Sequence, residues 1–72
     1  MWPFLSNKKP KEVRYIVFNE GEKLEFPLNV RIPSVGETIW MDVHHQGEIV
    51  SITNVIEFGF FVTTIHVKSF YE

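Results

Sequence analysis

Residues 23–32 read KLEFPLNVRI, and this stretch decides the fold class. Apolar side chains fill every second position, at Leu24, Phe26, Leu28, Val30 and Ile32. Successive side chains of a β-strand point to opposite faces, so the pattern predicts a long strand with one buried and one wet face. Pro27 falls on the wet face and has no N–H, so we expect it to mark an edge position or a bulge.

The segments around this stretch have the same β character. Residues 13–18 (VRYIVF) are β-branched and aromatic, and further strands are expected at 38–43, at about 48–56 and at 61–67. Turn signals separate them at 19–22, 33–37, 44–47 and 57–60, and each contains one of the four glycines. Gly21 and Gly47 are expected to supply left-handed backbone conformations. The sequence therefore predicts an all-β domain, a five-stranded antiparallel meander that forms a curled sheet or small barrel.

Alternation within the remaining strands predicts which side chains are buried together. In 38–43 the buried stripe is Ile39, Met41 and Val43, with Trp40 opposite. In the fourth strand Val50, Ile52 and Ile56 are expected to share a face, and in the fifth the aligned residues are Phe61, Ile65 and Val67.

Two stretches have the rhythm of a known architecture. Residues 31–39 read RIPSVGETI, and residues 47–52 read GEIVSI. This resembles the pattern of SH3-like small barrels, in which Pro-x-Val-Gly precedes one strand and a second glycine closes the next hairpin. The resemblance implies the fold and not the activity, because such barrels bind peptides, nucleic acids or their own copies.

The first twelve residues, MWPFLSNKKPKE, lack alternation, and Pro3 and Pro10 interrupt any long helix. We expect a basic N-terminal arm at 1–12 and a single β-barrel domain at 13–72. Residues 1–14 carry four basic side chains and one acidic one, whereas 15–72 carry three basic and eight acidic ones. The arm is therefore basic and the body acidic. The chain has no cysteine, no secretory signal pattern and no membrane-spanning run, so we expect a soluble cytoplasmic protein.

No complete catalytic or metal-binding constellation is evident. His44 and His45 are adjacent, so their side chains diverge in a strand, and His66 lies far along the chain. Asp42 is expected on the side of His44 and could orient it, but the pair lacks a nucleophile. The glycines are scattered one to a turn, so no phosphate-binding loop is present. We expect neither an enzyme nor a cofactor.

The remaining signal is an excess of aromatic side chains for one small core. These residues are Trp40, Phe58, Phe60, Phe70 and Tyr71. Aromatics gathered on a surface mark a binding patch or a subunit contact. The hypothesis is a non-enzymatic protein-interaction module that binds its own copies, as a homo-oligomer, or another protein.

Two alternatives depend on the N-terminal arm. A nucleic-acid-binding barrel would use Lys8, Lys9, Lys11 and Arg14 together with an aromatic platform, although the acidic body repels phosphate. Peripheral membrane attachment would use residues 1–11, with apolar insertion at Trp2-Pro3-Phe4-Leu5 beside the lysines.

Overall fold

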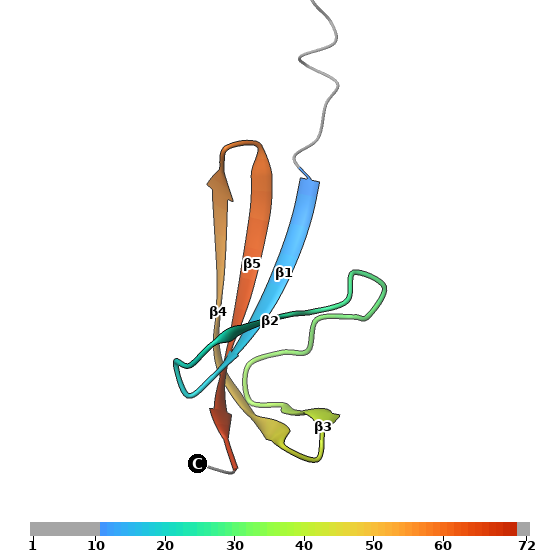
Figure 1. Ribbon diagram of the computed structural model, residues 1–72, viewed down its shortest axis with the longest axis vertical. Coiled ribbons are helices and arrows are strands. Elements are labelled where there is room, and N and C mark those ends of the chain that lie inside the picture. The colour runs from blue at the N-terminus through green and yellow to red at the C-terminus, as the bar shows by residue number, and fades with distance from the viewer. Residues whose placement is uncertain (1–10, 71–72) are drawn as a thin grey trace, which may run out of the picture.

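All regular structure in the computed structural model is β, and the model describes residues 11–70. The strands are β1 (Lys11–Phe18), β2 (Lys23–Glu25), β3 (Thr38–Asp42), β4 (His45–Glu57) and β5 (Phe60–Ser69). They form one curled sheet, a half-barrel with the strand order β2-β1-β5-β4-β3 (Figure 1). The predicted all-β class and the five strands are confirmed. Most of the expected N-terminal arm, residues 1–10, lies outside the described residues.

The sheet is mixed, because β1 and β5 pair in parallel over the whole of β1, from Lys11↔Phe60 to Phe18↔Val67. The prediction of a purely antiparallel sheet is wrong for this pair, whereas the other pairs are antiparallel. The reason is the odd number of strands. Each connection reverses the chain direction, so the first and fifth strands run the same way, and a sheet that joins them must pair them in parallel.

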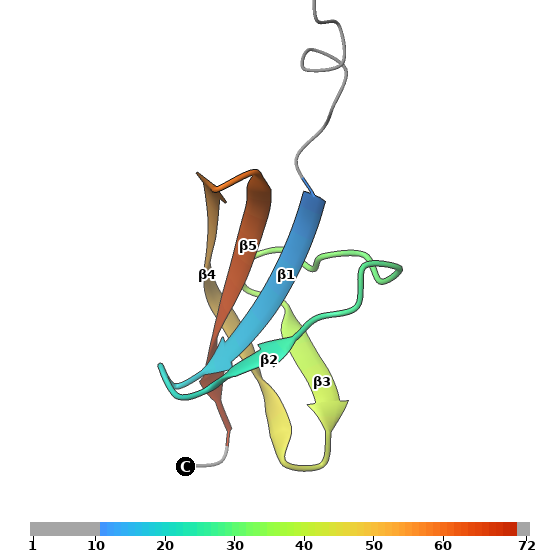
Figure 2. The same ribbon diagram turned by 45° about the horizontal axis from the view of Figure 1, so that its top comes forward.

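The half-barrel is open between β2 and β3, which Figure 2 shows as two separate edges joined by a loop. The strand predicted over residues 23–32 ends at Glu25, and residues 26–37 form a loop outside the sheet. Phe26 is the last residue of this segment to donate to β1, through its N–H to the Arg14 carbonyl. Pro27 then has no donor to offer. Leu28 and Val30 were expected to be buried, but they are 56% and 44% exposed.

The core lies on the concave face of the sheet. Its buried side chains are Ile16, Phe26, Ile39, Ile49, Ile65 and Val67. The predicted stripe of β5 is confirmed at Ile65 and Val67, and Phe61 is half-buried. Every second residue of β5 faces this side, so Thr63 between them is also buried.

Three further residues that were expected in the core, Val43, Val50 and Ile56, are exposed, and for the first two the reason is local. A bulge between Ile49 and Ser51 shifts the register of β4, so Ile49 is buried and Val50 is half exposed. Strand β3 ends at Asp42, which places Val43 in the following turn with 68% of its surface exposed. A bulge or a strand end leaves the alternation of apolar and polar residues in the sequence unchanged, so the alternation alone does not predict either of them.

Gly21 and Gly47 do not have the left-handed conformations expected of them. Asn19 and Glu20, and not Gly21, have positive φ in the first turn. Gly47 lies inside β4 and has no positive φ. A side chain at this position would collide with the Lys68 carbonyl oxygen and with Val67 Cγ1, so glycine is needed for close approach of β4 to β5.

Candidate protein-interaction surface

The turn between β4 and β5 combines an unusual backbone with an exposed aromatic side chain. Phe58 and Gly59 both have positive φ, 47° and 80°, as a type I′ hairpin requires. Asn or Gly is favoured at the first of these positions, and a bulky side chain there is a genuine outlier. The Phe58 side chain is 97% exposed, so it neither favours the turn nor packs in the core.

Residues from two strands surround this turn on the convex face of the sheet. Val13↔Val62 and Lys11↔Phe60 are register pairs of β1 and β5, so Val13, Val62 and Phe60 share a face. Together with Tyr15 and Phe58 they line a shallow hollow of about 320 Å³. We name these five residues the distal patch, after the end of the sheet that carries the β4–β5 turn, at the top of Figure 1.

Charged side chains border the distal patch. Lys23 and Glu57 line the same hollow, and the Lys23 Nζ lies 5.2 Å from the centre of the Tyr15 ring. An ammonium at this distance is attracted by the ring, so it holds Tyr15 in place from the β2 side. An apolar centre with a polar rim is the usual anatomy of a protein contact.

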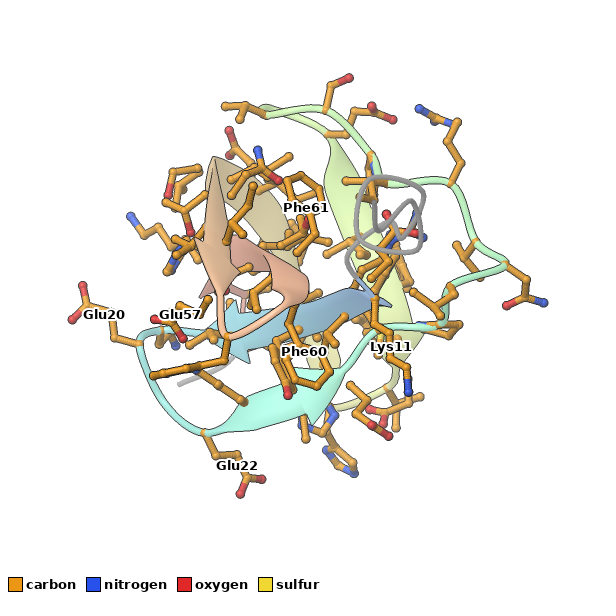
Figure 3. The ribbon with its side chains drawn as sticks, turned by 90° about the horizontal axis from the view of Figure 1, so that it is seen from above. Lys11, Glu20, Glu22, Glu57, Phe60 and Phe61 are labelled. Carbon is orange, nitrogen blue, oxygen red and sulfur yellow. The ribbon has the colours of Figure 1, made fainter. Side chains whose placement is uncertain are left out.

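The opposite face of this end is apolar as well. Figure 3 views the molecule end-on from above and shows Phe60 and Phe61 on opposite sides of β5. Ile56 pairs with Phe61 across the hairpin and is 68% exposed. Within the described residues, β2 and β3 pair only with the other half of β1 and β4. The distal end is therefore a three-stranded sheet of β1, β5 and β4, and it extends beyond the part of the half-barrel that contains β2 and β3.

The five predicted contact residues do not form one surface. Phe58 and Phe60 lie together at the distal end. Trp40, 68% exposed, lines a separate hollow beside the opening between β2 and β3. Phe70, 55% exposed, follows β5 at the other end of the sheet, where its N–H donates to the Gln46 carbonyl. Tyr71 lies outside the described residues.

The basic residues of the nucleic-acid alternative are also dispersed. Lys8 and Lys9 lie outside the described residues, and Lys11 is exposed at the start of β1. The Arg14 guanidinium donates to the carbonyls of Pro27, Leu28 and Val30 at 3.2, 3.1 and 2.8 Å, and its side chain is only 13% exposed. Arg14 therefore fastens the 26–37 loop to β1, and its charge is committed there.

The histidines have structural partners. Asp42 was expected to orient His44, but it accepts from the ring of His45, whose Nδ1 lies 2.9 Å from each carboxylate oxygen. From His44 it receives only the backbone N–H, at 2.7 Å. These two hydrogen bonds, that of the His45 side chain first, lower the pKa of Asp42.

The third histidine, His66, lies beside Thr53, with His66 Nε2 3.4 Å from Thr53 Oγ1. In residues 11–70 no three histidine or carboxylate side chains are grouped as metal ligands would be. This part of the chain likewise contains no helix with the length and hydropathy to cross a membrane.

Sequence reasoning found Phe58 and Phe60 of the distal patch as contact residues and missed Val13, Tyr15 and Val62. Val13 and Tyr15 flank Arg14 in β1, but Tyr15 is followed by Ile16 and Val62 is preceded by Phe61, so local alternation does not mark these residues as one set. The missing information was the parallel register of β1 and β5, which brings them beside Phe60. Comparison of the chain with protein-family models, with curated proteins and with solved structures gave no match.

Proposed function

We propose that this chain is a non-enzymatic protein-interaction module, which associates with its own copies or with another protein through exposed aromatic side chains at its distal end. Phe58 is the observation that carries the proposal. It occupies a strained backbone position with 97% of its surface in water, so folding gains nothing from it. A residue that costs stability and serves no packing role is best explained by a contact with another molecule.

The surroundings of Phe58 favour a protein as that molecule. The distal patch is an apolar hollow of about 320 Å³ with one acidic and one basic side chain at its rim. Lys23 is the single basic side chain among the lining residues, so the hollow does not concentrate positive charge as a phosphate ligand would require. Aromatic side chains at the centre of a contact supply much of its binding free energy.

The two alternatives find less support among the described residues. Residues 11–70 carry five basic and eight acidic side chains, and the guanidinium of Arg14 is bound to the loop. Lys11 is exposed at the start of β1, whereas Lys8, Lys9 and almost all of the proposed membrane anchor lie outside the described residues.

Substitution of Phe58 by asparagine tests the proposal, because it changes folding and association in opposite directions. Asparagine suits a type I′ turn, so Phe58→Asn keeps or raises the free energy of unfolding in urea at low protein concentration. Loss of one buried Phe contact, worth about 1.5–3 kcal/mol, weakens association by about ten- to a hundredfold. Light scattering measures self-association, and affinity capture with the wild-type and variant chains measures binding of other proteins.

Phe70→Asn is the matched control, since it removes an exposed phenyl ring from the other end of the sheet. We expect it to leave association within about threefold of wild type, well below the tenfold that corresponds to 1.4 kcal/mol. The proposal fails if Phe58→Asn associates as the wild type does, or if Phe70→Asn is the more damaging of the two.

A further inference from the structure

The outer edge of β4 has no neighbouring strand beyond its first third. β3 pairs with His45 to Glu48, and Ile49 exchanges hydrogen bonds with Glu37 and Gly36. After that point no described segment pairs with the outer side of β4. In Figures 1 and 2, β4 continues past the end of β3 with β5 on its inner side. From Thr53 to Glu57 every residue is exposed, although the strand continues without a break.

Strand geometry identifies the backbone groups that face outward. Glu57 pairs with Phe60 and closes a two-residue hairpin, so its N–H and C=O point toward β5. Backbone groups alternate in direction along a strand, so those of Ile56, Asn54 and Ile52 point away from β5. Ile49 also points outward, toward Glu37, and the bulge before Ser51 accounts for the change from odd to even positions.

The free edge lacks the features that prevent strands from pairing between molecules. Residues 50–57 read VSITNVIE, with no proline, no lysine and a single charge at Glu57. Exposed edges are normally protected by charges, prolines or covering segments. The edge of β2 shows such protection, with Lys23 and Glu25 in the strand and Pro27 just after it.

We infer that a second copy of this chain pairs with the outer edge of β4, antiparallel to it, with the two-fold axis at Asn54. This inference rests on the proposed function and gives its self-association a geometry. An antiparallel pair of identical strands has two-fold symmetry. Among the possible registers, the one centred on Asn54 is the one that uses all three outward residues, Ile52, Asn54 and Ile56, on both copies.

This register brings exposed apolar side chains together. Ile56, 68% exposed, lies opposite Ile52 of the second copy, and this contact occurs twice. Val55 lies opposite Thr53 of the second copy, and Phe58 extends toward its half-exposed Val50. Glu57 lies opposite Ser51 of the second copy, so no like charges meet.

The central residue suits a symmetric position. Thr63 Oγ1 donates to Asn54 Oδ1 at 2.9 Å, which fixes the amide on the concave face. The amide N–H groups of Asn54 then serve as donors to Asn54 of the second copy. A polar residue at the axis specifies register, since a shift of the axis to Thr53 or Val55 leaves these groups opposite isoleucine.

Single-cysteine variants test this geometry, because the natural chain has no cysteine. In Asn54→Cys the two thiols of the pair meet at the axis, on Cα atoms about 5.5 Å apart, which a disulfide spans. In the control Val50→Cys they are about eight residues apart along the strand, roughly 27 Å. Under mild oxidation of the full chain we expect disulfide-linked dimers of Asn54→Cys to form at least tenfold faster than those of Val50→Cys.

A second pair of variants leaves Asn54 and its bond to Thr63 intact. Thr53 and Val55 are both exposed and lie opposite each other across the axis. A mixture of Thr53→Cys and Val55→Cys should form the mixed disulfide faster than either variant couples to itself. Equal coupling in all mixtures, or no coupling at all, overturns the inference. If the wild-type chain self-associates while these disulfides do not form, the edge pairing is wrong and the proposed function stands.

Discussion

Asp42 shows how a single side chain defines the turn between β3 and β4. Its carboxylate accepts from the ring of His45 and from the backbone N–H of His44. The His45 ring in turn packs against Phe18, with ring centres 5.2 Å apart. A carboxylate thus connects an exposed turn to the end of β1, and both donors favour its charged form.

The pKa of Asp42 therefore depends on His45. Its value lies below the ordinary 3.8, chiefly because of His45. A carboxyl with a lowered pKa stabilises the fold at pH values above its unfolded pKa, and this contribution is lost as the pH falls through the folded pKa. An NMR titration of the Asp42 carboxyl should give a midpoint below 3.8 in the wild type and a higher one in His45→Ala. His66→Ala serves as control and should not move it; an unchanged midpoint in His45→Ala would contradict the account.

The sequence predicted local structure correctly where that structure depends on residues adjacent in the chain. The Glu57-Phe58-Gly59-Phe60 turn was predicted and is confirmed, because a glycine between two β-patterned runs favours a hairpin. Gly47 was misjudged, because its need for glycine comes from Lys68 and Val67 on another strand. A steric requirement set by a distant segment leaves no trace in the neighbouring residues.

At the scale of elements, Arg14 decides the course of the 26–37 loop. Three carbonyls of the loop converge on its Nη1. Its second guanidinium nitrogen, Nη2, lies 3.3 Å from Glu12. The chain after Pro27 would otherwise have no backbone partners on β1, so the guanidinium replaces the hydrogen bonds that a continued strand would have made.

Arg14→Met should therefore destabilise the protein far more than Arg31→Met. Hydrogen bonds from a charged donor contribute about 1.5–3 kcal/mol, and the substitution removes those of the Arg14 guanidinium, whose side chain is only 13% exposed. Arg31 makes an exposed ion pair with Glu37, and such pairs contribute about 0–1 kcal/mol. Urea unfolding measures both losses, and faster proteolysis within 26–37 should accompany only the first. Equal losses in the two variants would refute the role given to Arg14.

The strand predicted over residues 23–32 is too long, because β2 ends at Glu25. Leu24 and Phe26 do turn inward, but Leu28 and Val30 do not, although the alternation continues through all of them. Alternation indicates a buried face only while a partner strand is present. Pro27 indicated an interruption, whereas the guanidinium that redirects the chain lies on β1 and is invisible in the local pattern.

At the scale of the whole molecule, the parallel β1–β5 pair has two consequences. It moves the opening of the half-barrel to the β2–β3 connection, and it extends β1 alongside the distal hairpin. The distal patch exists only because of this pairing, since Val13 and Tyr15 come from β1 and Phe60 and Val62 from β5. The sequence predicted excess aromatic residues, but their division between two ends of the sheet required the topology.

We propose that the distal end is the surface through which this chain contacts another copy. A dilution series of amide NMR spectra of the full chain tests both the association and its place. We predict concentration-dependent shifts or broadening centred on Ile52, Asn54, Ile56 and Phe58, with little change at Trp40 and Phe70. Spectra that do not change with concentration, or changes centred on Trp40 and Phe70, would contradict it.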